Sequence, residues 1–327
     1  MDQAAAAIAA DAVRQHRGYE EPAAKLAELI GLMDQLPTVS ACLLTYKRAA
    51  VLPRTIGDLL AQSFTDFELV ISDDCSPDNT REIGEAFAAK DPRVRYCRNE
   101  RNLRYAGNQN AAVERARGKY VAFLHDGDRY SPQLLERWVA AMESCPKAAL
   151  VFNAVNVLDR EGNVSGGYDH GYNPCNPGLE FYDHMLTSIH SPIFGIVMAR
   201  RDALLAAGPF DLTLPVLADI DMWFRLLSQG DVAYVPERLY SIYPREADHP
   251  NARVNWAIRD ELTRIYRAAC DRRYERGSPE WQRARRTLDR ALLKADSRDM
   301  AVSVAKLRWG TAAAGIPHLF RRHALGR

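Results

Sequence analysis

The fold is decided by the stretch Gly118-Lys-Tyr-Val-Ala-Phe-Leu-His-Asp-Gly-Asp128. Residues 120–124 form a short apolar run with β-branched and aromatic members, which predicts a strand buried on both faces. The run ends at His125-Asp126-Gly127-Asp128, so two carboxylates follow the carboxyl end of this strand. Open α/β sheets bind ligands at that end, and a D-x-D pair can hold a hard divalent cation that binds diphosphate oxygens. A solvated Asp-Gly turn is the alternative interpretation.

The segments around this strand alternate between strand and helix patterns. Strands are predicted at 39–44, 67–72, 94–97, 149–157 and 196–199, with amphipathic helices between most of them. Such alternation indicates a mostly parallel sheet, so the carboxyl ends of the parallel strands share one edge. Polar residues follow two of these strands, as Thr45-Tyr46-Lys47-Arg48 and Asp73-Asp74-Cys75-Ser76. The sequence therefore predicts a binding site along this edge.

Composition and missing motifs disfavour several functional classes. The 327 residues are 47% hydrophobic and carry a net charge of +1, which is typical of a globular protein and argues against a dedicated nucleic-acid binder. Neither G-x-G-x-x-G nor G-x-x-x-x-G-K-[ST] occurs, which disfavours a dinucleotide-dependent oxidoreductase and a P-loop enzyme.

Cysteine usage and the apolar segments predict a cytoplasmic protein. The six cysteines form no C-x-x-C pair, so we expect reduced thiols and neither a disulfide framework nor a zinc site. The alanine-rich start has no basic region before it, and no signal peptide is predicted. The sequence also contains no run of about eighteen apolar residues that would predict a membrane-spanning helix.

The chain divides into three predicted parts. Residues 1–36 are expected to form a helical N-terminal arm, residues 37–250 an α/β domain, and residues 251–327 a basic helical extension. Within the α/β domain, the stretch 163–178 is rich in glycine, proline and tyrosine and predicts a long binding loop or lid, with a merely mobile loop as the alternative.

The C-terminal extension is basic. Residues 271–327 hold fourteen Lys and Arg against six Asp and Glu, and charged and apolar residues interleave toward the end of the chain. Such a tail can lie on an anionic membrane surface, which predicts peripheral contact with the cytoplasmic membrane. Packing on the catalytic domain or contact between copies of the chain in an oligomer is the alternative.

Six stretches, in sequence order, make the chain resemble the family 2 glycosyltransferases. The resemblance covers about residues 37–250. It implies a GT-A fold, in which a mostly parallel central sheet is flanked by helices and one half binds the nucleotide in a Rossmann-like manner. The stretches are Thr45-Tyr-Lys-Arg48, Phe67-Glu-Leu-Val-Ile-Ser-Asp-Asp-Cys-Ser76, Asn102-Leu-Arg-Tyr-Ala-Gly-Asn-Gln-Asn-Ala111, residues 118–128, Gly208-Pro-Phe-Asp211 and Ala218-Asp-Ile-Asp-Met-Trp-Phe-Arg225.

The same resemblance assigns roles on the donor side. Asp74 would accept a hydrogen bond from the nucleotide base, and Asp126 would contact the ribose. Asp128 would bind Mn²⁺ or Mg²⁺, with His249 completing the metal shell or meeting the diphosphate. An exposed histidine without a role is the alternative for His249. The remaining residues of the donor pocket would be Thr45, Tyr46, Arg48 and Arg104.

The acceptor side is expected near a helix that begins close to residue 219. Asp219 matches the family's catalytic aspartate and would be the general base. Asp221 precedes Arg225 by four residues, which predicts an exposed helix ion pair worth about a few tenths of a kcal/mol. A role toward the acceptor is the other interpretation of Asp221. Tyr168 and Tyr172 of the predicted loop could stack on sugar faces.

These expectations combine into one function. The resemblance implies an inverting, metal-dependent transfer of a sugar from a nucleoside diphosphate, with UDP slightly favoured, to a hydroxyl of a saccharide or lipid-linked saccharide in cell-surface polysaccharide synthesis. A sugar-1-phosphate nucleotidyltransferase is the alternative on the same fold, although the sequence has no Gly-rich, basic phosphate loop near its start. A non-catalytic nucleotide-sugar-binding module is the alternative from another class.

Overall fold

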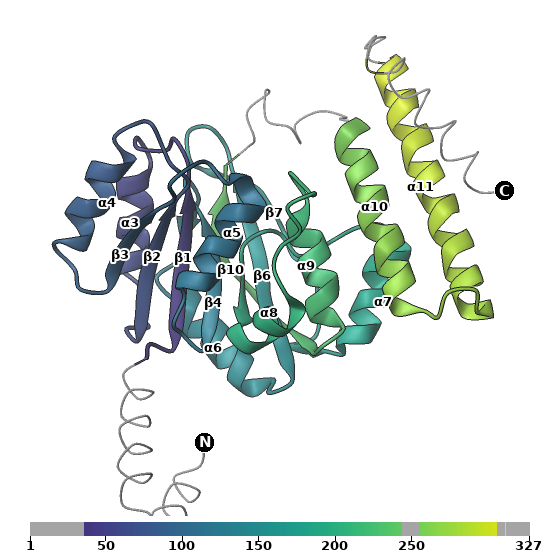
Figure 1. The fold of residues 1–327 in the computed structure, drawn as a ribbon, viewed down its shortest axis with the longest axis horizontal. Helices are drawn as coiled ribbons and strands as arrows, with labels where there is room; N and C mark the ends of the chain where they lie inside the picture. Colours follow the sequence, from purple (N-terminus) through teal and green to yellow (C-terminus); the bar gives the residue numbers. More distant parts are fainter. Residues whose placement is uncertain (1–35, 244–255, 306–310, 312–327) are drawn as a thin grey trace, which may run out of the picture.

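A computed structural model describes residues 36–243, 256–305 and 311 of the chain (Figure 1). In this part of the chain, ten strands form one sheet in the order β3-β2-β1-β4-β9-β6-β10-β5, with β7 paired to β6 and β8 to β10. The strands are β1 (Val39–Thr45), β2 (Phe67–Asp73), β3 (Val94–Arg98), β4 (Tyr120–His125), β5 (Arg129–Tyr130), β6 (Ala148–Leu158), β7 (Val164–Tyr168), β8 (Cys175–Asn176), β9 (Val197–Arg200) and β10 (Asp231–Ile242).

The direction of the strands sends most carboxyl ends to one edge. β1 pairs in parallel with β2 and β4, with Val39 opposite both Phe67 and Tyr120, and β2 pairs in parallel with β3. β9 runs antiparallel between β4 and β6, and β10 runs parallel to β6. All residues of β1 and β2 are buried, as expected for strands covered on both faces. The predicted α/β fold with a central sheet is confirmed, and its parallel pairings are those of β1 with β2 and β4, of β2 with β3, and of β6 with β10. The sheet as a whole is mixed, because β5, β7, β8 and β9 run antiparallel to their partners.

Helices cover both faces of the sheet (Figure 1). One face packs against α3, α4 and α6, which contribute side chains such as Leu52, Phe87 and Trp138. The other packs against α5 and α7 to α10, which contribute residues such as Tyr182 and Trp223. The helices are α3 (Leu52–Leu60), α4 (Thr80–Ala88), α5 (Arg104–Arg115), α6 (Leu134–Ser144), α7 (Gly178–Ser188), α8 (Arg201–Ala207), α9 (Ala218–Leu227), α10 (Trp256–Arg273) and α11 (Pro279–Ala305).

The helices α10 and α11 share the core of the sheet domain. Ile265 and Tyr266 of α10 and Leu288 of α11 are buried in the cluster that also contains the α9 side chains. The Tyr182 hydroxyl of α7 donates to the Ala269 carbonyl of α10 at 2.7 Å. None of the helices described has the length and apolarity needed to cross a membrane.

The stretch 163–178 is less irregular than the sequence suggests. Its first part is β7, which pairs with β6 and places Tyr168 opposite Val155, and its last part is β8, which pairs with β10. Gly167 permits the close β6–β7 approach, because a Cβ at this position would lie 2.5 Å from the Val155 carbonyl oxygen. Gly167, one of the glycines that suggested a flexible loop, therefore serves strand pairing, and the part between the strands, residues 169–174, is shorter than expected.

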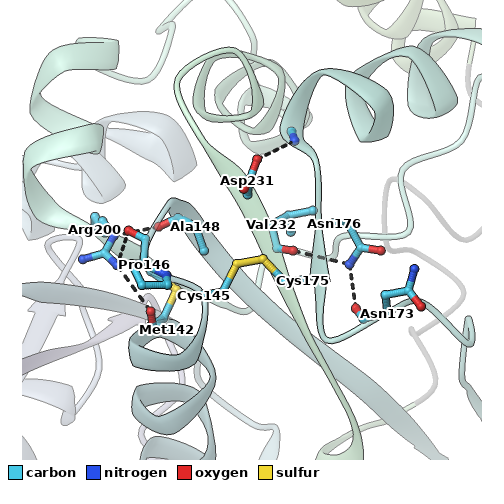
Figure 2. The surroundings of a disulfide bond; sticks show 11 residues. Met142, Cys145, Pro146, Ala148, Asn173, Cys175, Asn176, Arg200, Asp231 and Val232 are labelled. Atoms are coloured by element: carbon cyan, nitrogen blue, oxygen red, sulfur yellow. Dashed lines mark hydrogen bonds between the residues drawn. A yellow bond between two sulfur atoms is a disulfide. The ribbon is translucent and has the colours of Figure 1, made fainter.

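The expectation that every cysteine is a reduced thiol is wrong for one pair. Cys145, at the end of α6, is bonded to Cys175 in β8, and their Cα atoms are 5.8 Å apart, which is ordinary for a disulfide (Figure 2). The bond lies at the amino edge of the sheet, where β6 and β10 begin. Thirty residues separate the two cysteines, so only the tertiary fold brings them together. Cys42, Cys75, Cys97 and Cys270 are free.

Candidate active site

The carboxyl edge of the sheet joins the ends of β1, β2 and β4. The Asp74 amide donates to the Thr45 carbonyl at 3.0 Å, and the Asp126 amide donates to the Leu44 carbonyl at 3.4 Å. These backbone bonds bring the residues after each strand onto one surface. The structure therefore places Thr45, Asp74 and Asp126 in one neighbourhood, as predicted from parallel topology.

Asp126 is a half-buried carboxylate with weak partners. Its side chain is 14% exposed, it accepts a hydrogen bond from the Tyr46 amide at 3.3 Å, and its Oδ1 lies 3.6 Å from the Arg48 Nε. Burial raises the pKa of Asp126 to about 6, although Thr45, Arg48 and the Tyr46 amide act in the opposite direction. The Arg48 side chain is 56% exposed, so its charge is well solvated and offsets the burial only in part. The edge thus holds negative charge that the protein does not fully compensate.

The turn that carries Asp128 is held by helix α3. Gly127 has φ +88°, its amide donates to Thr55 Oγ1 at 3.2 Å, and its carbonyl accepts from Arg54 Nη2 at 2.8 Å. Beyond the turn, burial raises the pKa of Tyr130 and Tyr240 well above the ordinary value, and the charge of Asp128 adds to both shifts. Asp128 therefore lies within electrostatic reach of these two tyrosines, at the end of the sheet where β5 meets β10.

The two aspartates after β2 differ in their surroundings. Asp73 is fully buried and accepts from Tyr96 Oη at 2.6 Å, from Arg98 Nη1 at 2.8 Å and from the Ser76 amide at 2.9 Å. Asp74 uses Oδ1 to accept from Asn99 Nδ2 at 2.9 Å and from the Leu103 amide at 2.7 Å. Asp73 therefore fixes the end of β2. Asp74 also ties down the chain before Arg104, and these protein contacts are made through one of its two oxygens.

Left-handed backbone conformations gather in the loops of this edge. Among the described non-glycine residues, positive φ occurs at Lys47 (+56°), Cys75 (+61°), Arg104 (+63°) and Ile189 (+51°). The first two follow β1 and β2, and the third begins α5. Each such residue costs about 1–2 kcal/mol, so their clustering marks a region where the packing forces a particular loop shape. Arg104 is exposed, and its side chain is available to a ligand at the mouth of the edge.

Asp219 and Asp221 both lie in the first turn of α9, in different environments. Because α9 leads into β10 and packs beside β4, with Phe123 and Trp223 rings 6.3 Å apart, its amino end lies toward the carboxyl edge. Asp219 is half-buried there. Asp221 pairs with Arg225 Nε at 2.9 Å, as the spacing predicts, and also with Arg272 Nη2 of α10 at 2.8 Å. The expectation of an exposed pair is wrong, because Asp221 is 6% exposed and joins two arginines.

Sequence reasoning missed a residue that supports the start of α9. Glu261 of α10 is buried, and its Oε1 accepts hydrogen bonds from the Val216 amide at 3.0 Å and the Leu217 amide at 2.6 Å. These amides immediately precede α9, so Glu261 holds the turn that delivers Asp219. A local pattern could not reveal this contact, because about 45 residues separate the partners.

Sequence reasoning also missed a contact between two side chains at the carboxyl edge, those of Tyr105 and His125. The Tyr105 hydroxyl lies 3.3 Å from His125 Nε2, and a Cβ at Gly195 would lie 2.7 Å from both His125 Cε1 and the Tyr105 hydroxyl. The backbone before β9 therefore packs directly against these two side chains, and Gly195 leaves room for that contact. The signal available in the sequence was the alternation of β4, which places His125 on the same face as Phe123.

The predicted acceptor tyrosines lie in different settings. Tyr168 is 47% exposed at the end of β7, with its ring 5.5 Å from that of Phe194. Tyr172 is half-buried, and its ring packs 4.9 Å from Phe181 and 5.6 Å from Tyr234. Of the two, only Tyr168 presents an open ring face. His249, the last predicted site residue, lies outside the described residues.

Comparisons with known proteins agree with this arrangement. The sequence matches Glycosyl transferase family 2 over residues 40–206. An uncharacterized glycosyltransferase of Methanocaldococcus jannaschii is 35% identical over 204 residues, which are 61% of this chain and 68% of the relative. Chondroitin synthase of Escherichia coli is 31% identical over 210 residues, which are 64% of this chain and 29% of that enzyme.

The fold has solved counterparts as well. The structure of S. aureus TarS 1-349 in complex with UDP-GlcNAc superposes with a TM-score of 0.65 at 17% sequence identity, covering 87% of this chain and 81% of that chain. A second TarS 1-349 structure, in complex with UDP, superposes with a TM-score of 0.61. Sequence and fold together show that the chain is a glycosyltransferase with the GT-A fold and belongs to glycosyl transferase family 2.

Proposed function

We propose that the chain transfers a sugar from a nucleoside-diphosphate donor, with UDP favoured, to a hydroxyl of a saccharide or lipid-linked saccharide, with inversion at the sugar carbon. The observation that carries the proposal is the carboxyl edge, where the half-buried Asp126 lies beside Tyr46 and Arg48 and α9 brings Asp219 to the same side of the sheet. Inversion and polysaccharide synthesis are carried over from the family resemblance and from relatives such as chondroitin synthase.

The donor would bind across the ends of β1, β2 and β4. Asp74 would accept from the base N–H, Tyr46, which is 40% exposed, would offer a ring face, and Thr45 would lie beneath them. Arg48 and Arg104, both exposed, would approach the phosphates. TarS, which shares the fold, was solved with UDP and with UDP-GlcNAc, which supports a uridine nucleotide as the first donor to test.

A divalent cation fits the chemistry of this edge. Asp126 and Asp128 supply the carboxylate oxygens that Mn²⁺ and Mg²⁺ prefer. Burial raises the pKa of Asp126 to about 6, and a cation bound beside it would favour the ionised carboxylate. Asp128 would hold the ion, with His249 as a further ligand. The bound ion would offset charge on the departing diphosphate.

The number of protein ligands indicates how the ion would be held. Within the described ranges, one group of three potential ligand side chains has its ligand atoms within 4.8 Å of one another. It consists of Cys145, Cys175 and Asp231 at the opposite edge, and its two sulfur atoms are already joined in the disulfide. The carboxyl edge offers no such closed cage among the residues described. An ion there would take many of its oxygens from the donor diphosphate and from water, so metal binding and donor binding should depend on each other.

Asp219 would remove the proton from the acceptor hydroxyl. It lies in the first turn of α9, where Glu261 fixes the preceding backbone, so its position is set by two helices. The acceptor would approach between Asp219 and the exposed Tyr168, and the hydroxyl oxygen would attack the sugar carbon from the side opposite the diphosphate. Transfer to a lipid-linked acceptor would also use the basic C-terminal tail, of which residues 306–310 and 312–327 lie outside the described residues.

The proposal is tested by asking whether metal-dependent binding of the donor nucleotide requires Asp128. We expect UDP with Mn²⁺ to raise the melting temperature of the parent protein and the Asp128→Ala variant to lose this stabilisation, because diphosphate binding then depends on side-chain charge alone. Asp202→Ala removes an exposed carboxylate in α8 and is the matched control. Binding of UDP with Mn²⁺ by Asp128→Ala as tightly as by the parent would contradict the metal assignment.

A further inference from the structure

A polar pocket adjoins the proposed transfer site at the far end of the sheet. It lies where the ends of β6 and β10 meet β5 and has a volume of about 310 Å³. We call it the Arg238 pocket. Arg129, which follows Asp128 directly, and Tyr130 and Tyr240, which feel the charge of Asp128, all line it. Its further lining residues include Asn156, Ser241 and Arg238.

A bulge in β10 places Arg238 at this pocket. Val235 is opposite Asn153 of β6, but the next partner, Ala154, is opposite Arg238, so two residues of β10 are skipped in the pairing. Such bulges redirect side chains and are common beside functional sites. The Arg238 guanidinium lies against Gly167 of β7, where an added Cβ would be 3.1 Å from Arg238 Cζ. A glycine and a bulge therefore both make room for one arginine.

The charges around the pocket leave Arg238 without a close counterion. Among the described residues that line the pocket, none is acidic. Arg129 is paired with Asp58, with Nε to Oδ2 at 2.7 Å. In the described part of the chain, no carboxylate lies within 4 Å of the Arg238 guanidinium nitrogens. The nearby Asp169 feels the charge of Arg238, but it accepts its hydrogen bonds from the Tyr234 hydroxyl at 2.7 Å and the Gly171 amide at 3.1 Å. Arg238 is exposed, so its charge faces an opening with amide and hydroxyl groups beside it.

We propose that the Arg238 pocket is an acceptor subsite that binds the carboxylate or phosphate group of an anionic saccharide. Arg238 would form charge-assisted hydrogen bonds with the anion, and Asn156 and Ser241 would donate further ones. The subsite lies two strands beyond β9 on the carboxyl edge, so it would hold a sugar of the acceptor chain away from the reacting hydroxyl. The inference rests on the proposed function, because it names the class of acceptor for the same transfer site.

The experiment compares simple charged and neutral probes by NMR titration, with UDP and Mn²⁺ present. The probes are methyl glucuronide, glucose 6-phosphate and methyl glucoside. We expect the parent to bind at least one anionic probe about tenfold or more tightly than the glucoside, and Arg238→Gln to lose this preference. Arg137→Gln is the matched control, because Arg137 is an exposed arginine that pairs with the neighbouring Glu237. A preference for the glucuronide identifies a carboxylate, and a preference for the sugar phosphate identifies a phosphate.

Two readouts keep this proposal separate from the proposed function. Thermal stabilisation by UDP and Mn²⁺ should be unchanged in Arg238→Gln, because the variant leaves the donor edge intact. Equal preference in the parent and Arg238→Gln, or no preference in the parent, would overturn the anionic subsite. Loss of preference in Arg137→Gln would overturn it as well, because it would show a general effect of surface charge. Anion binding by a parent protein that does not bind UDP would overturn the acceptor role.

Discussion

Two carboxylates on opposite edges of the same sheet have opposite chemistry. Glu68, near the start of β2, is 3% exposed and accepts from Ser40 Oγ at 2.6 Å, from Arg95 at 2.7 Å and from Arg117 Nε at 2.9 Å. Burial opposes ionisation, but the hydrogen bonds from Ser40, Arg117 and Arg95 together hold the pKa of Glu68 below its ordinary value. For Asp126 at the carboxyl edge, burial prevails and the pKa is raised.

The difference separates structure from function within one sheet. At the amino edge, the protein supplies every partner that the carboxylate needs, so the charge stabilises the fold. At the carboxyl edge, the Asp126 carboxylate has one amide at 3.3 Å, one solvated arginine and the Thr45 side chain, and these do not offset its burial. A ligand that brings hydrogen-bond donors or positive charge can complete that shell. Incomplete compensation of a half-buried charge is therefore a physical signature of the binding edge.

The largest expected effect divides Asp219 from Asp221. Asp219→Asn should lower transfer by about a hundred- to ten-thousand-fold at saturating donor, because general-base catalysis contributes that much. Its melting temperature should stay close to that of the parent. Asp221→Asn should instead lower the free energy of unfolding by about 3–5 kcal/mol, since it leaves Arg225 and Arg272 without their buried partner. Transfer rates and denaturant unfolding of both variants decide the assignment, and near-parental transfer by Asp219→Asn would contradict it.

The next largest effect concerns the amino edge and its disulfide. The Cys145–Cys175 bond closes a 30-residue separation, so the double Cys→Ser variant should lose about 3–4 kcal/mol of unfolding free energy. Equilibrium unfolding in urea, with and without reductant, measures the loss. Cys75→Ser, which changes a free and half-buried thiol, serves as the control and should unfold like the parent. Identical unfolding of the parent in both conditions would show that the bond adds no stability.

Charge removal at the two edges should change stability in opposite directions. Glu68→Gln should lower the free energy of unfolding by about 2–3 kcal/mol, because charge-assisted bonds from Arg95 and Arg117 are weakened. Asp126→Asn should leave that free energy equal or higher, since it removes a half-buried charge that is poorly compensated, and should weaken UDP binding. Urea unfolding and UDP titration test both variants. A lower free energy of unfolding for Asp126→Asn than for the parent would contradict the proposed difference between the two edges.

The last prediction concerns the pH dependence that Asp126 adds to folding. Its pKa is about 6 in the folded protein against an ordinary value of 3.8, so the folded state binds more protons between these values. Stability should therefore fall as the pH rises from about 4 to about 6, by up to about 3 kcal/mol, and this term should be constant above that window. The difference in unfolding free energy between the parent and Asp126→Asn isolates it. A difference that does not change with pH would contradict the effect of burial on Asp126.

Local sequence patterns were sufficient to predict most of the sheet. The apolar run 120–124 predicted β4 to within one residue, and alternation with helices predicted the parallel core and the edge that holds Thr45, Asp74 and Asp126. The reversed direction of β9 had no local signal, because an isolated four-residue strand has the same pattern in either direction. The bond between Cys145 and Cys175, the second arginine on Asp221 and the support of α9 by Glu261 depend on contacts over tens of residues, which only tertiary packing determines.

The contacts of α10 limit how this enzyme can be divided or recombined. Glu261 holds the backbone before α9 and Arg272 neutralises Asp221, so one helix from outside the matched family region supports the turn that carries Asp219. A chimaera that exchanges the C-terminal helices with those of a relative would have to preserve both contacts. A catalytic fragment that ends before α10 would lack Tyr266 and Leu288, and core side chains such as Phe224 of α9 would lose these partners. Along this chain, the modular unit for engineering therefore extends beyond the family motif and includes α10 and α11.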